Sequence, residues 1–219
     1  DTATLCGAEG KASLRIYGAK AINGYICHEA SIRILLAYFA KMAAQFNYGI
    51  EPLLSLAELH YVRIFLKLNR GSEKAVKSVE SIGFASLCRK CGSFYYSRYC
   101  PNQKCEFCGT ETQAFGPLWL SSLHSKQVVE KMLDYAEDRQ IKNTLEKIKE
   151  EADIPFFYNI DLITRYLGVG SVSRSKVIEA LKSEGKSASI TVLGKNGIKT
   201  NARMEEVAEA VKSAGQAHT

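Results

Sequence analysis

The chain has 219 residues, 46% of them hydrophobic, and a formal net charge of +6. A chain of this length and composition forms one large domain or a few small ones, and it buries a core without covalent crosslinks. Its longest apolar stretch, residues 32–44, is interrupted by Arg33 and Lys41, which excludes a membrane span there.

Both the start of the chain and its cysteines indicate the cellular setting. The chain begins Asp1-Thr2-Ala3, with neither an initiator methionine nor a basic segment followed by an apolar one, so we expect a fragment of a longer chain. Five of the seven cysteines crowd into residues 88–108. An odd number of clustered cysteines is typical of metal binding in a reducing compartment. We therefore predict a cytoplasmic protein without a membrane partner.

The first half of the chain alternates predicted strands and helices. Residues 12–21 alternate apolar and polar side chains, which predicts a strand, and residues 28–46 carry apolar residues at helical spacing. Two strands, a helix and a further strand are expected at residues 50–59, 60–68, 72–82 and 84–87. This order of elements is ferredoxin-like. We predict a ferredoxin-like unit over residues 26–124, with a zinc ribbon inserted at residues 85–112.

The second half is predicted to be mostly helical. Residues 125–152, rich in Glu and Lys, indicate one connecting helix. Beyond it, two short helices, a hairpin and a closing helix are expected at residues 160–167, 173–183, 187–199 and 204–213. Two helices followed by a hairpin suggest a winged-helix-like unit over residues 153–219. The fold class is therefore α+β.

Four cysteines give the strongest chemical signal in the chain. They form two pairs with two residues inside each pair and thirteen between the pairs: Cys88 with Cys91, and Cys105 with Cys108. Two such turns supply a tetrahedral Zn²⁺ site with no open position, which is structural rather than catalytic. Cys100 lacks a partner at this spacing, so we leave it outside the site. The alternative is four thiols without metal.

Basic and aromatic residues indicate nucleic-acid binding. The segment of residues 63–104 contains nine basic residues and two acidic ones. This excess of positive charge suits a phosphate backbone. Aromatic residues between the cysteine pairs either stack on bases or cover a ribbon that has almost no core. The predicted RNA contacts are Arg63, Lys67, Lys90, Arg98, Arg174, Lys176 and Lys199. For each basic segment, a solvated protein surface is the alternative.

The chain carries no recognisable catalytic or cofactor motif. It has no Gly-rich phosphate loop and no nucleophile elbow, and His28-Glu29 at a predicted helix start is more typical of a structural pair than of acid–base chemistry. We assign no catalytic or cofactor-binding residue and expect no small-molecule substrate for this chain alone. Two rivals remain: a stand-alone zinc-ribbon and winged-helix regulator that reads duplex DNA, and a scaffold that binds a protein.

Several collinear runs resemble the tRNA (guanine-N2)-dimethyltransferase family, which acts on guanosine 26. The resemblance spans nearly the whole chain. The runs are residues 1–7 (DTATLCG), Leu14-Arg15 with Tyr17, residues 24–29 (GYICHE) with Arg33-Ile34-Leu35, His60-Tyr61 with Arg63, Phe65 and Lys67, residues 116–119 (GPLW), 154–158 (IPFFY) and 197–202 (GIKTNA).

This resemblance implies an S-adenosylmethionine-dependent enzyme whose Rossmann-like catalytic domain precedes a family-specific C-terminal domain. Residues 1–25 would be the end of that catalytic core. The cofactor loop and the catalytic Asp-Pro-Phe-Gly run of the family would lie upstream, so this chain alone is expected to be inactive. Its role would be to hold tRNA, with the missing catalytic domain as a partner.

The sequence departs from the family pattern in two places. Ser121 stands where a glycine is common, and residues 190–194 lack the usual His and Ser-Pro. The resemblance would assign a tRNA contact to the segment around these residues. From that segment only Lys199 is carried over as a predicted RNA contact.

Overall fold

The structure, a computed structural model, describes residues 2–58, 61–99 and 102–216. Its first part contains four helices and a strand pair: α1 (Thr2–Leu5), α2 (Gly10–Tyr17), α3 (Cys27–Ala44), β1 (Tyr48–Glu58), β2 (Tyr61–Arg70) and α4 (Ser72–Glu80). A three-stranded sheet follows, made of β3 (Ile82–Leu87), β4 (Phe94–Ser97) and β5 (Gln113–Trp119), and its strand order is β4-β3-β5.

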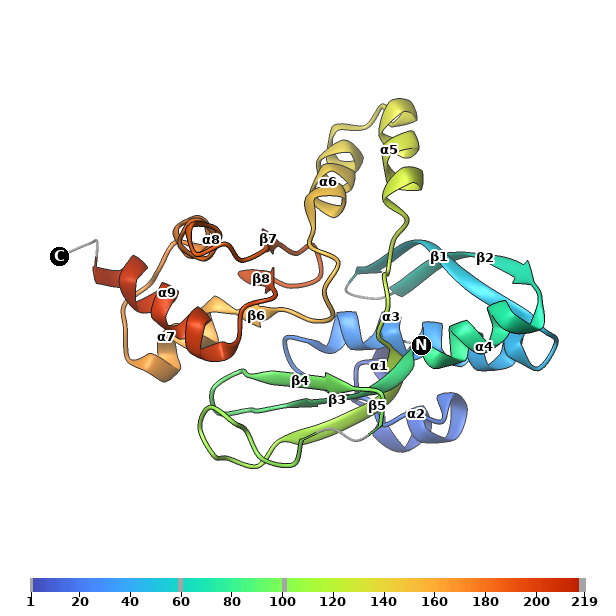
Figure 1. Cartoon of the computed structure of the whole chain (residues 1–219), viewed down its shortest axis with the longest axis horizontal. Helices are drawn as coiled ribbons and strands as arrows, with labels where there is room; N and C mark the ends of the chain where they lie inside the picture. Colours follow the sequence, from blue (N-terminus) through green and yellow to red (C-terminus); the bar gives the residue numbers. More distant parts are fainter. Residues whose placement is uncertain (1, 59–60, 100–101, 217–219) are drawn as a thin grey trace.

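Two helices then project from the body of the molecule, α5 (Lys126–Tyr135) and α6 (Arg139–Glu150) (Figure 1). The C-terminal part contains a small sheet and three helices: β6 (Tyr158–Asn159), α7 (Ile160–Leu167), α8 (Arg174–Ser183), β7 (Ala188–Ile190), β8 (Gly197–Thr200) and α9 (Met204–Gln216). The order of the small sheet is β6-β8-β7.

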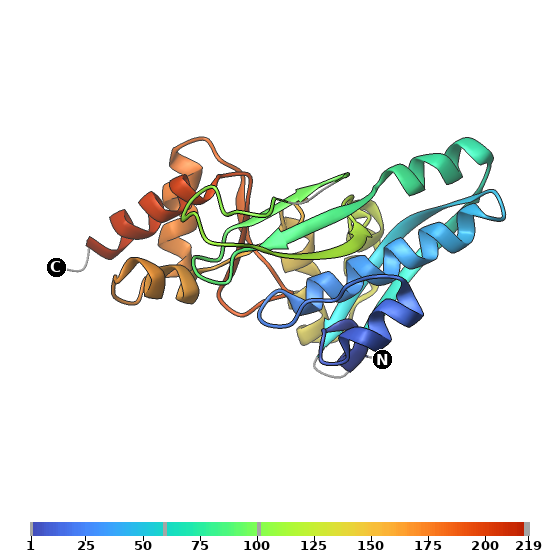
Figure 2. The ribbon, with the colours of Figure 1, turned by 90° about the horizontal axis from the view of Figure 1, so that it is seen from below.

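Helix α3 is the central element because it buries residues on more than one face. Residues 27–44 contain neither Gly nor Pro, so no residue interrupts the backbone hydrogen bonds. Ile32 and Leu36 pack toward the strand pair, while Ile34 packs toward β3 and β5. Figure 2 shows α3 running along β1 and β2, with α1 and α2 on its other side. Apolar residues on more than one side of a helix indicate burial, as observed in the N-terminal half of α3, whereas Phe39 and Met42 toward its end are exposed.

The strand pair exposes a basic and aromatic row. Strands β1 and β2 pair antiparallel from Tyr48–Arg70 to Glu58–Tyr61, and successive side chains of β2 alternate between partly buried and exposed. Inward-facing Val62, Ile64 and Leu66 pack on the α3 cluster. The exposed set is Tyr61, Arg63, Phe65 and Lys67. The predicted strands at residues 50–59 and 60–68 are confirmed, apart from residues 59–60, which lie outside the described part.

The predicted strand at residues 12–21 is wrong. Its residues form α2, which ends at Gly18 in the left-handed conformation. The alternating pattern misled because it does not report burial: Leu14 is 61% and Ile16 44% exposed, whereas Ser13 is buried and donates a hydrogen bond to the Ala19 carbonyl.

The ferredoxin-like order is therefore also wrong. That order needs its four strands in one sheet, but here the described strands of residues 26–124 fall in two sheets, β1-β2 and β4-β3-β5. The two sheets lie on different sides of α3, and each forms its own hydrophobic cluster with that helix. The coarser α+β class is confirmed.

The predicted connecting helix at residues 125–152 is two helices. Ala136 is extended, and Asp138 begins α6 because its carboxylate accepts hydrogen bonds from the N–H groups of Gln140 and Ile141. The first N–H groups of a helix have no partner within it, and here the N-cap carboxylate accepts from two of them. A second helix therefore starts at this point. The two helices pack against each other and against β1 through Leu54, Val129 and Leu145.

The elements predicted after residue 153 are confirmed in kind and order. Asn159 caps α7 by accepting from the Leu162 N–H, and Gly168 ends it in the left-handed conformation. The predicted hairpin is β7 paired with β8, and β6 extends it to three strands. This small sheet lies between the helices α7–α9 and the rest of the molecule (Figure 1).

Candidate metal centre and nucleic-acid interface

The four predicted cysteines meet at one point. The Sγ atoms of Cys88, Cys91, Cys105 and Cys108 all lie within 4.8 Å of one another, and three of the four residues are buried. The Sγ atoms of Cys88 and Cys108 are 3.4 Å apart, and those of Cys91 and Cys105 are 3.5 Å apart. These distances are too long for a disulfide bond, which measures about 2.05 Å. Sulfurs of a tetrahedral zinc site, with Zn–S near 2.3 Å, lie about 3.8 Å apart.

Two similar turns hold the sulfurs in place. The N–H of Gly92 bonds to the carbonyl of Cys88, and that of Gly109 bonds to the carbonyl of Cys105. Both glycines have positive φ, 85° and 71°, where a side chain is strained. Each pair of cysteines therefore presents two sulfurs on one side of a tight turn. The donor set of four thiols with no open position fits a structural Zn²⁺ ion.

Hydroxyl groups surround the sulfurs. Ser93 Oγ lies 3.0 Å from Cys91 Sγ, Thr110 Oγ1 lies 3.4 Å from Cys108 Sγ, and Tyr95 OH lies 3.4 Å from Cys105 Sγ. Burial raises the pKa of the Cys105 thiol, but the hydrogen bond from Tyr95 and other bonds to the sulfur outweigh it and lower that pKa to about 6. Such outer partners orient metal ligands.

The aromatic residues between the cysteine pairs divide into two groups. The Phe94 ring packs on that of Tyr158, with centroids 4.6 Å apart, and Tyr95 contributes its hydroxyl to the cysteine cluster. Tyr96 is 43% and Tyr99 80% exposed. Phe94 and Tyr95 therefore cover the ribbon, as the second alternative predicted. Tyr96 and Tyr99 are exposed, and stacking on bases stays a prediction for them. Cys100 lies outside the described residues.

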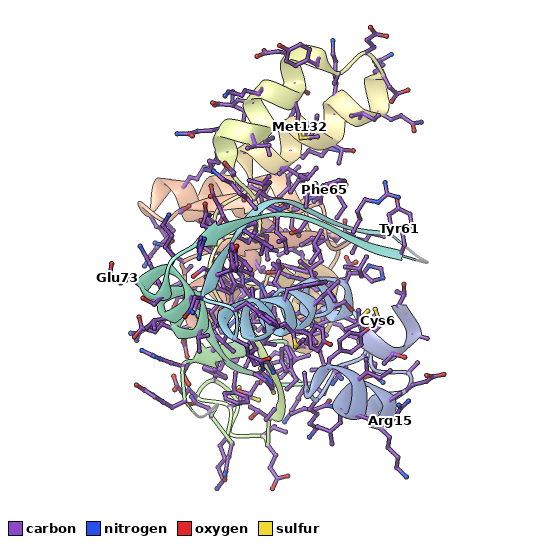
Figure 3. The ribbon with its side chains drawn as sticks, turned by 90° about the vertical axis from the view of Figure 1, so that its right-hand side faces the viewer. Cys6, Arg15, Tyr61, Phe65, Glu73 and Met132 are labelled. Carbon is purple, nitrogen blue, oxygen red and sulfur yellow. The ribbon has the colours of Figure 1, made fainter. Side chains whose placement is uncertain are left out.

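Six of the predicted RNA-contacting residues lie at or near the surface, in four separate places. Arg63 and Lys67 are exposed on β2, where the Arg63 guanidinium lies 5.3 Å from the Tyr61 ring centroid. In Figure 3, Phe65 of the same row lies on the side of the strand pair that faces α5 and α6, and Tyr61 lies toward its tip.

The other four surface residues lie elsewhere. Lys90 is exposed in the first cysteine turn, and Arg98 follows β4, where it makes a 3.4 Å ion pair with the exposed Glu80. Arg174 and Lys176 are half-buried in the first turn of α8, at the opposite end of the molecule from β2 (Figures 1 and 2). The sequence therefore identified basic surface residues but did not show that they form no single patch.

Lys199 does not fit its predicted RNA contact. Its side chain is 4% exposed, and its ammonium lies 2.9 Å from Glu151 and 3.4 Å from Glu29. Glu29 Oε1 also accepts from the Arg33 side chain at 2.8 Å and from the Phe156 N–H at 2.7 Å. A buried ammonium needs such carboxylate partners, because desolvation of an isolated charge is prohibitive.

These residues form a buried ion cluster, which we define as Glu29, Arg33, Glu151 and Lys199. The Arg33 guanidinium also donates to the carbonyl groups of Trp119 and Ser121, and Glu151 accepts from Thr191 and the Val192 N–H. The cluster thus joins α3, the segment after β5, the end of α6 and the β7–β8 hairpin. Burial would raise the pKa of Glu29, but the charges of Lys199 and Arg33 hold it below its usual range.

His124 borders this cluster. Its Nδ1 accepts a hydrogen bond from the Ser55 N–H, which leaves the proton of the neutral ring on Nε2. Burial, together with the positive charge of Lys199, lowers the pKa of His124 to about 4. Among the described side-chain atoms, His124 Nε2 and Glu29 Oε2 are buried without a hydrogen-bond partner.

A cleft between β1, α4 and the segment after β5 was not predicted. It has a volume of about 590 Å³ and is lined by two exposed lysines, Lys74 and Lys77, by several serines and by Trp119. Both lysines belong to the basic excess seen in the sequence, but a charge count does not show that they lie beside a cavity. The cleft offers hydroxyl and ammonium donors, which suit phosphate and ribose oxygens.

None of the helices within the described residues is long and apolar enough to cross a membrane.

A family model and the relatives found by sequence comparison indicate the same family. The profile of the family described as "N2,N2-dimethylguanosine tRNA methyltransferase" matches residues 1–212. A tRNA (guanine(26)-N(2))-dimethyltransferase of Pyrococcus furiosus is 36% identical over 97% of this chain, and that of Thermococcus kodakarensis is 38% identical, also over 97%.

A solved structure shares the fold. The structure titled "Complex structure of Trm1 from Pyrococcus horikoshii with S-adenosyl-L-Methionine" matches with a TM-score of 0.85 and 35% identity over 96% of this chain. The chain spans 56% of that protein, and also 56% of each of the two relatives.

Proposed function

The chain belongs to the N2,N2-dimethylguanosine tRNA methyltransferase family, and we propose that it is the tRNA-holding part of a cytoplasmic enzyme that methylates N2 of guanosine 26. The methyl donor of that enzyme is S-adenosylmethionine, which supplies the activated methyl group. The transfer chemistry belongs to a catalytic domain outside this chain, and residues 1–25 are the end of that domain.

The exposed row on β2 carries this proposal. Tyr61, Arg63, Phe65 and Lys67 alternate aromatic and basic side chains along one face of an extended strand. Such a row combines base stacking with phosphate pairing, the two contacts by which proteins hold single-stranded or unpaired RNA. Guanosine 26 must leave its stack to be methylated, at a cost of a few kcal/mol, so a surface that holds the surrounding RNA contributes to its exposure.

Zinc has a supporting role in the proposal. Cys88, Cys91, Cys105 and Cys108 hold one structural Zn²⁺, which fixes the ribbon that carries Lys90 and Arg98. The exposed rings of Tyr96 and Tyr99 lie on the same ribbon. We also propose that the α7, α8 and β7–β8 elements act as a winged-helix-like unit, in which Arg174 and Lys176 at the start of α8 contact the tRNA backbone.

The test compares nucleic acids at controlled salt concentration, because phosphate contacts make affinity salt-dependent. The 219-residue chain is expected to bind folded tRNA more tightly than duplex DNA of equal length. Calorimetry is expected to show no binding of S-adenosylmethionine to this chain. A methyl-transfer assay of the same samples is expected to show no methylation of tRNA. Equal or tighter binding to DNA would favour a DNA-reading regulator instead.

A variant separates RNA binding from a scaffold role. Charge reversal at Lys67, Lys90 and Arg98 is expected to lower tRNA affinity by at least tenfold, on the order of 1.4 kcal/mol. The matched control reverses Lys11, Lys20 and Lys126, which are also at the surface. An equal tRNA affinity for both triple variants would contradict the proposed interface and leave the scaffold role.

A further inference from the structure

A second group of metal-binding side chains lies apart from the four-cysteine cluster. The Sγ atoms of Cys6 and Cys27 and a ring nitrogen of His28 lie within 4.8 Å of one another. All three residues are partly exposed, whereas most of the ribbon cysteines are buried. Figure 3 shows Cys6 where the N-terminal helices meet α3. No part of the proposed tRNA-binding surface uses these residues.

The backbone fixes the first of the three side chains. Cys6 follows α1, and its N–H bonds to the Thr2 carbonyl. The next residue, Gly7, has a φ of 80°, and a Cβ there would lie 2.9 Å from the Ile22 backbone. The turn that carries Cys6 is therefore pressed against the segment leading into α3. Only glycine permits this approach at positive φ.

The start of α3 fixes the other two. Cys27 is the first residue of α3, and its N–H bonds to the Gly24 carbonyl. His28 follows directly. Ser31, one turn later, donates its hydroxyl to the Cys27 carbonyl at 2.7 Å, and its Oγ lies 3.2 Å from Cys6 Sγ. The turn after α1 and the start of α3 thus bring these residues together.

Two sulfurs and an imidazole are the preferred ligands of Zn²⁺. The ligand atoms of a tetrahedral zinc site lie less than about 4 Å apart, so a group within 4.8 Å needs only a small contraction. Packing alone does not account for the group, since thiols that merely fill a core are among the most buried side chains. Three protein ligands leave one coordination position open, in contrast to the closed four-cysteine site.

We propose that Cys6, Cys27 and His28 form a second zinc site, with its fourth position open to water. The site is half-exposed at the start of α3, so the metal exchanges with solvent more readily than one held by the four-cysteine cluster. Zn²⁺ there would link the segment of residues 2–7 to α3.

The test measures zinc per chain in the whole 219-residue protein, purified with zinc and passed through gel filtration. Wild type is expected to carry about two zinc ions and Cys6→Ala about one, a loss of one per chain. The matched control is Ser31→Ala, which removes the hydroxyl next to Cys6 but no ligand and is expected to retain the wild-type number. The difference between variants does not depend on whether the four-cysteine cluster is filled.

A second variant covers a folding defect. If the circular dichroism of Cys6→Ala shows that the variant is unfolded, His28→Gln is used instead. This variant removes one ligand and leaves the turn at Gly7 unchanged. It is expected to weaken zinc binding by at least tenfold in a chelator competition. Equal zinc content in wild type, Cys6→Ala and His28→Gln overturns the proposal. A Cys6–Cys27 disulfide in the freshly purified, zinc-supplied protein, found by peptide mapping, overturns it as well.

Discussion

The four-cysteine cluster and the buried ion cluster are built in opposite ways. The cysteines come from 21 consecutive positions and two similar turns. The ion cluster joins residues up to 170 positions apart, from Glu29 to Lys199. The first is visible as a spacing motif, whereas the second exists only once the chain has folded. Local spacing therefore indicates which cysteines come together, but it does not indicate whether a lysine is exposed.

The largest expected effect tests the local cluster. Cys105→Ser removes one of the four proposed zinc ligands, and structural zinc contributes roughly 10 kcal/mol or more to the folding of small metal domains. We expect loss of zinc and loss of amide protection from hydrogen exchange across β3–β5, while α7–α9 stay protected. Hydrogen exchange with mass spectrometry measures both regions in one experiment.

The matched control is Glu106→Ser, which changes the exposed residue next to Cys105 in the same turn. It is expected to retain zinc and the protection of β3–β5. A zinc-free wild-type chain with a protected ribbon would show that the cluster needs no metal, and the contrast between the two centres would then lose its physical basis.

The next effect tests the long-range cluster. Lys199→Met leaves Glu151 buried without its ammonium partner, and breaking one partner of a buried pair costs about 3–5 kcal/mol. The free energy of unfolding from urea denaturation is expected to fall by that amount. Lys195→Met, on the exposed part of the same hairpin, is the control and is expected to change it by less than about 0.5 kcal/mol. Similar losses in both variants would contradict a buried role for Lys199.

Local patterns and long-range contacts also differ in how well the sequence predicts the fold. Helix α3, the strand pair and the elements after residue 153 were found because each carries its own periodicity or cap. The strand predicted at residues 12–21 failed because Leu14 and Ile16 are exposed in a helix, so their alternation had no structural meaning. Sheet partners were also not predictable, since packing on α3 decides that β3 pairs with β4 and β5 rather than with β1.

The candidate site divides in the same manner. Spacing predicted Cys88, Cys91, Cys105 and Cys108 correctly as one group. Charge counting predicted surface positions for Arg63 and Lys67. Lys199 was carried over from the family resemblance but is buried. A lysine has the same sequence signature whether it faces water or two carboxylates. His124 gave no signal at all, since its partner Ser55 lies 69 positions away.

His124 supplies a smaller and pH-dependent test of the long-range cluster. Its pKa in the folded chain is about 4, below the 6.5 of an unperturbed histidine. The unfolded chain therefore binds more protons between pH 4 and 6.5, so this contribution to stability is fully present above pH 6.5 and is lost as the pH falls toward 4. The loss amounts to about 3 kcal/mol at pH 4.

We expect His124→Gln to have a flatter profile of unfolding free energy between pH 6.5 and 4 than wild type. The measurement is urea denaturation at several pH values, and the readout is the difference between the two profiles, because carboxylates such as Glu29 titrate in both proteins. Parallel profiles would show that His124 does not remain neutral in the folded chain.

The smallest effect asks whether the exposed lysines differ from the buried one in function as well as in stability. Lys67→Gln removes one exposed charge from β2. The loss of a single phosphate contact reduces the magnitude of the slope of log affinity against log salt by about 1. We expect tRNA affinity to fall roughly threefold to tenfold at low salt, with the unfolding free energy unchanged.

The first control is Lys11→Gln. It removes the same charge from an exposed lysine on α2 and is expected to leave the salt slope unaltered. Lys199→Met, measured under conditions where it is folded, is expected to leave the slope unaltered too, because its ammonium is already paired within the protein. A reduced slope for Lys199→Met but not for Lys67→Gln would reverse the assignment and place the RNA contact at the β7–β8 hairpin instead of on β2.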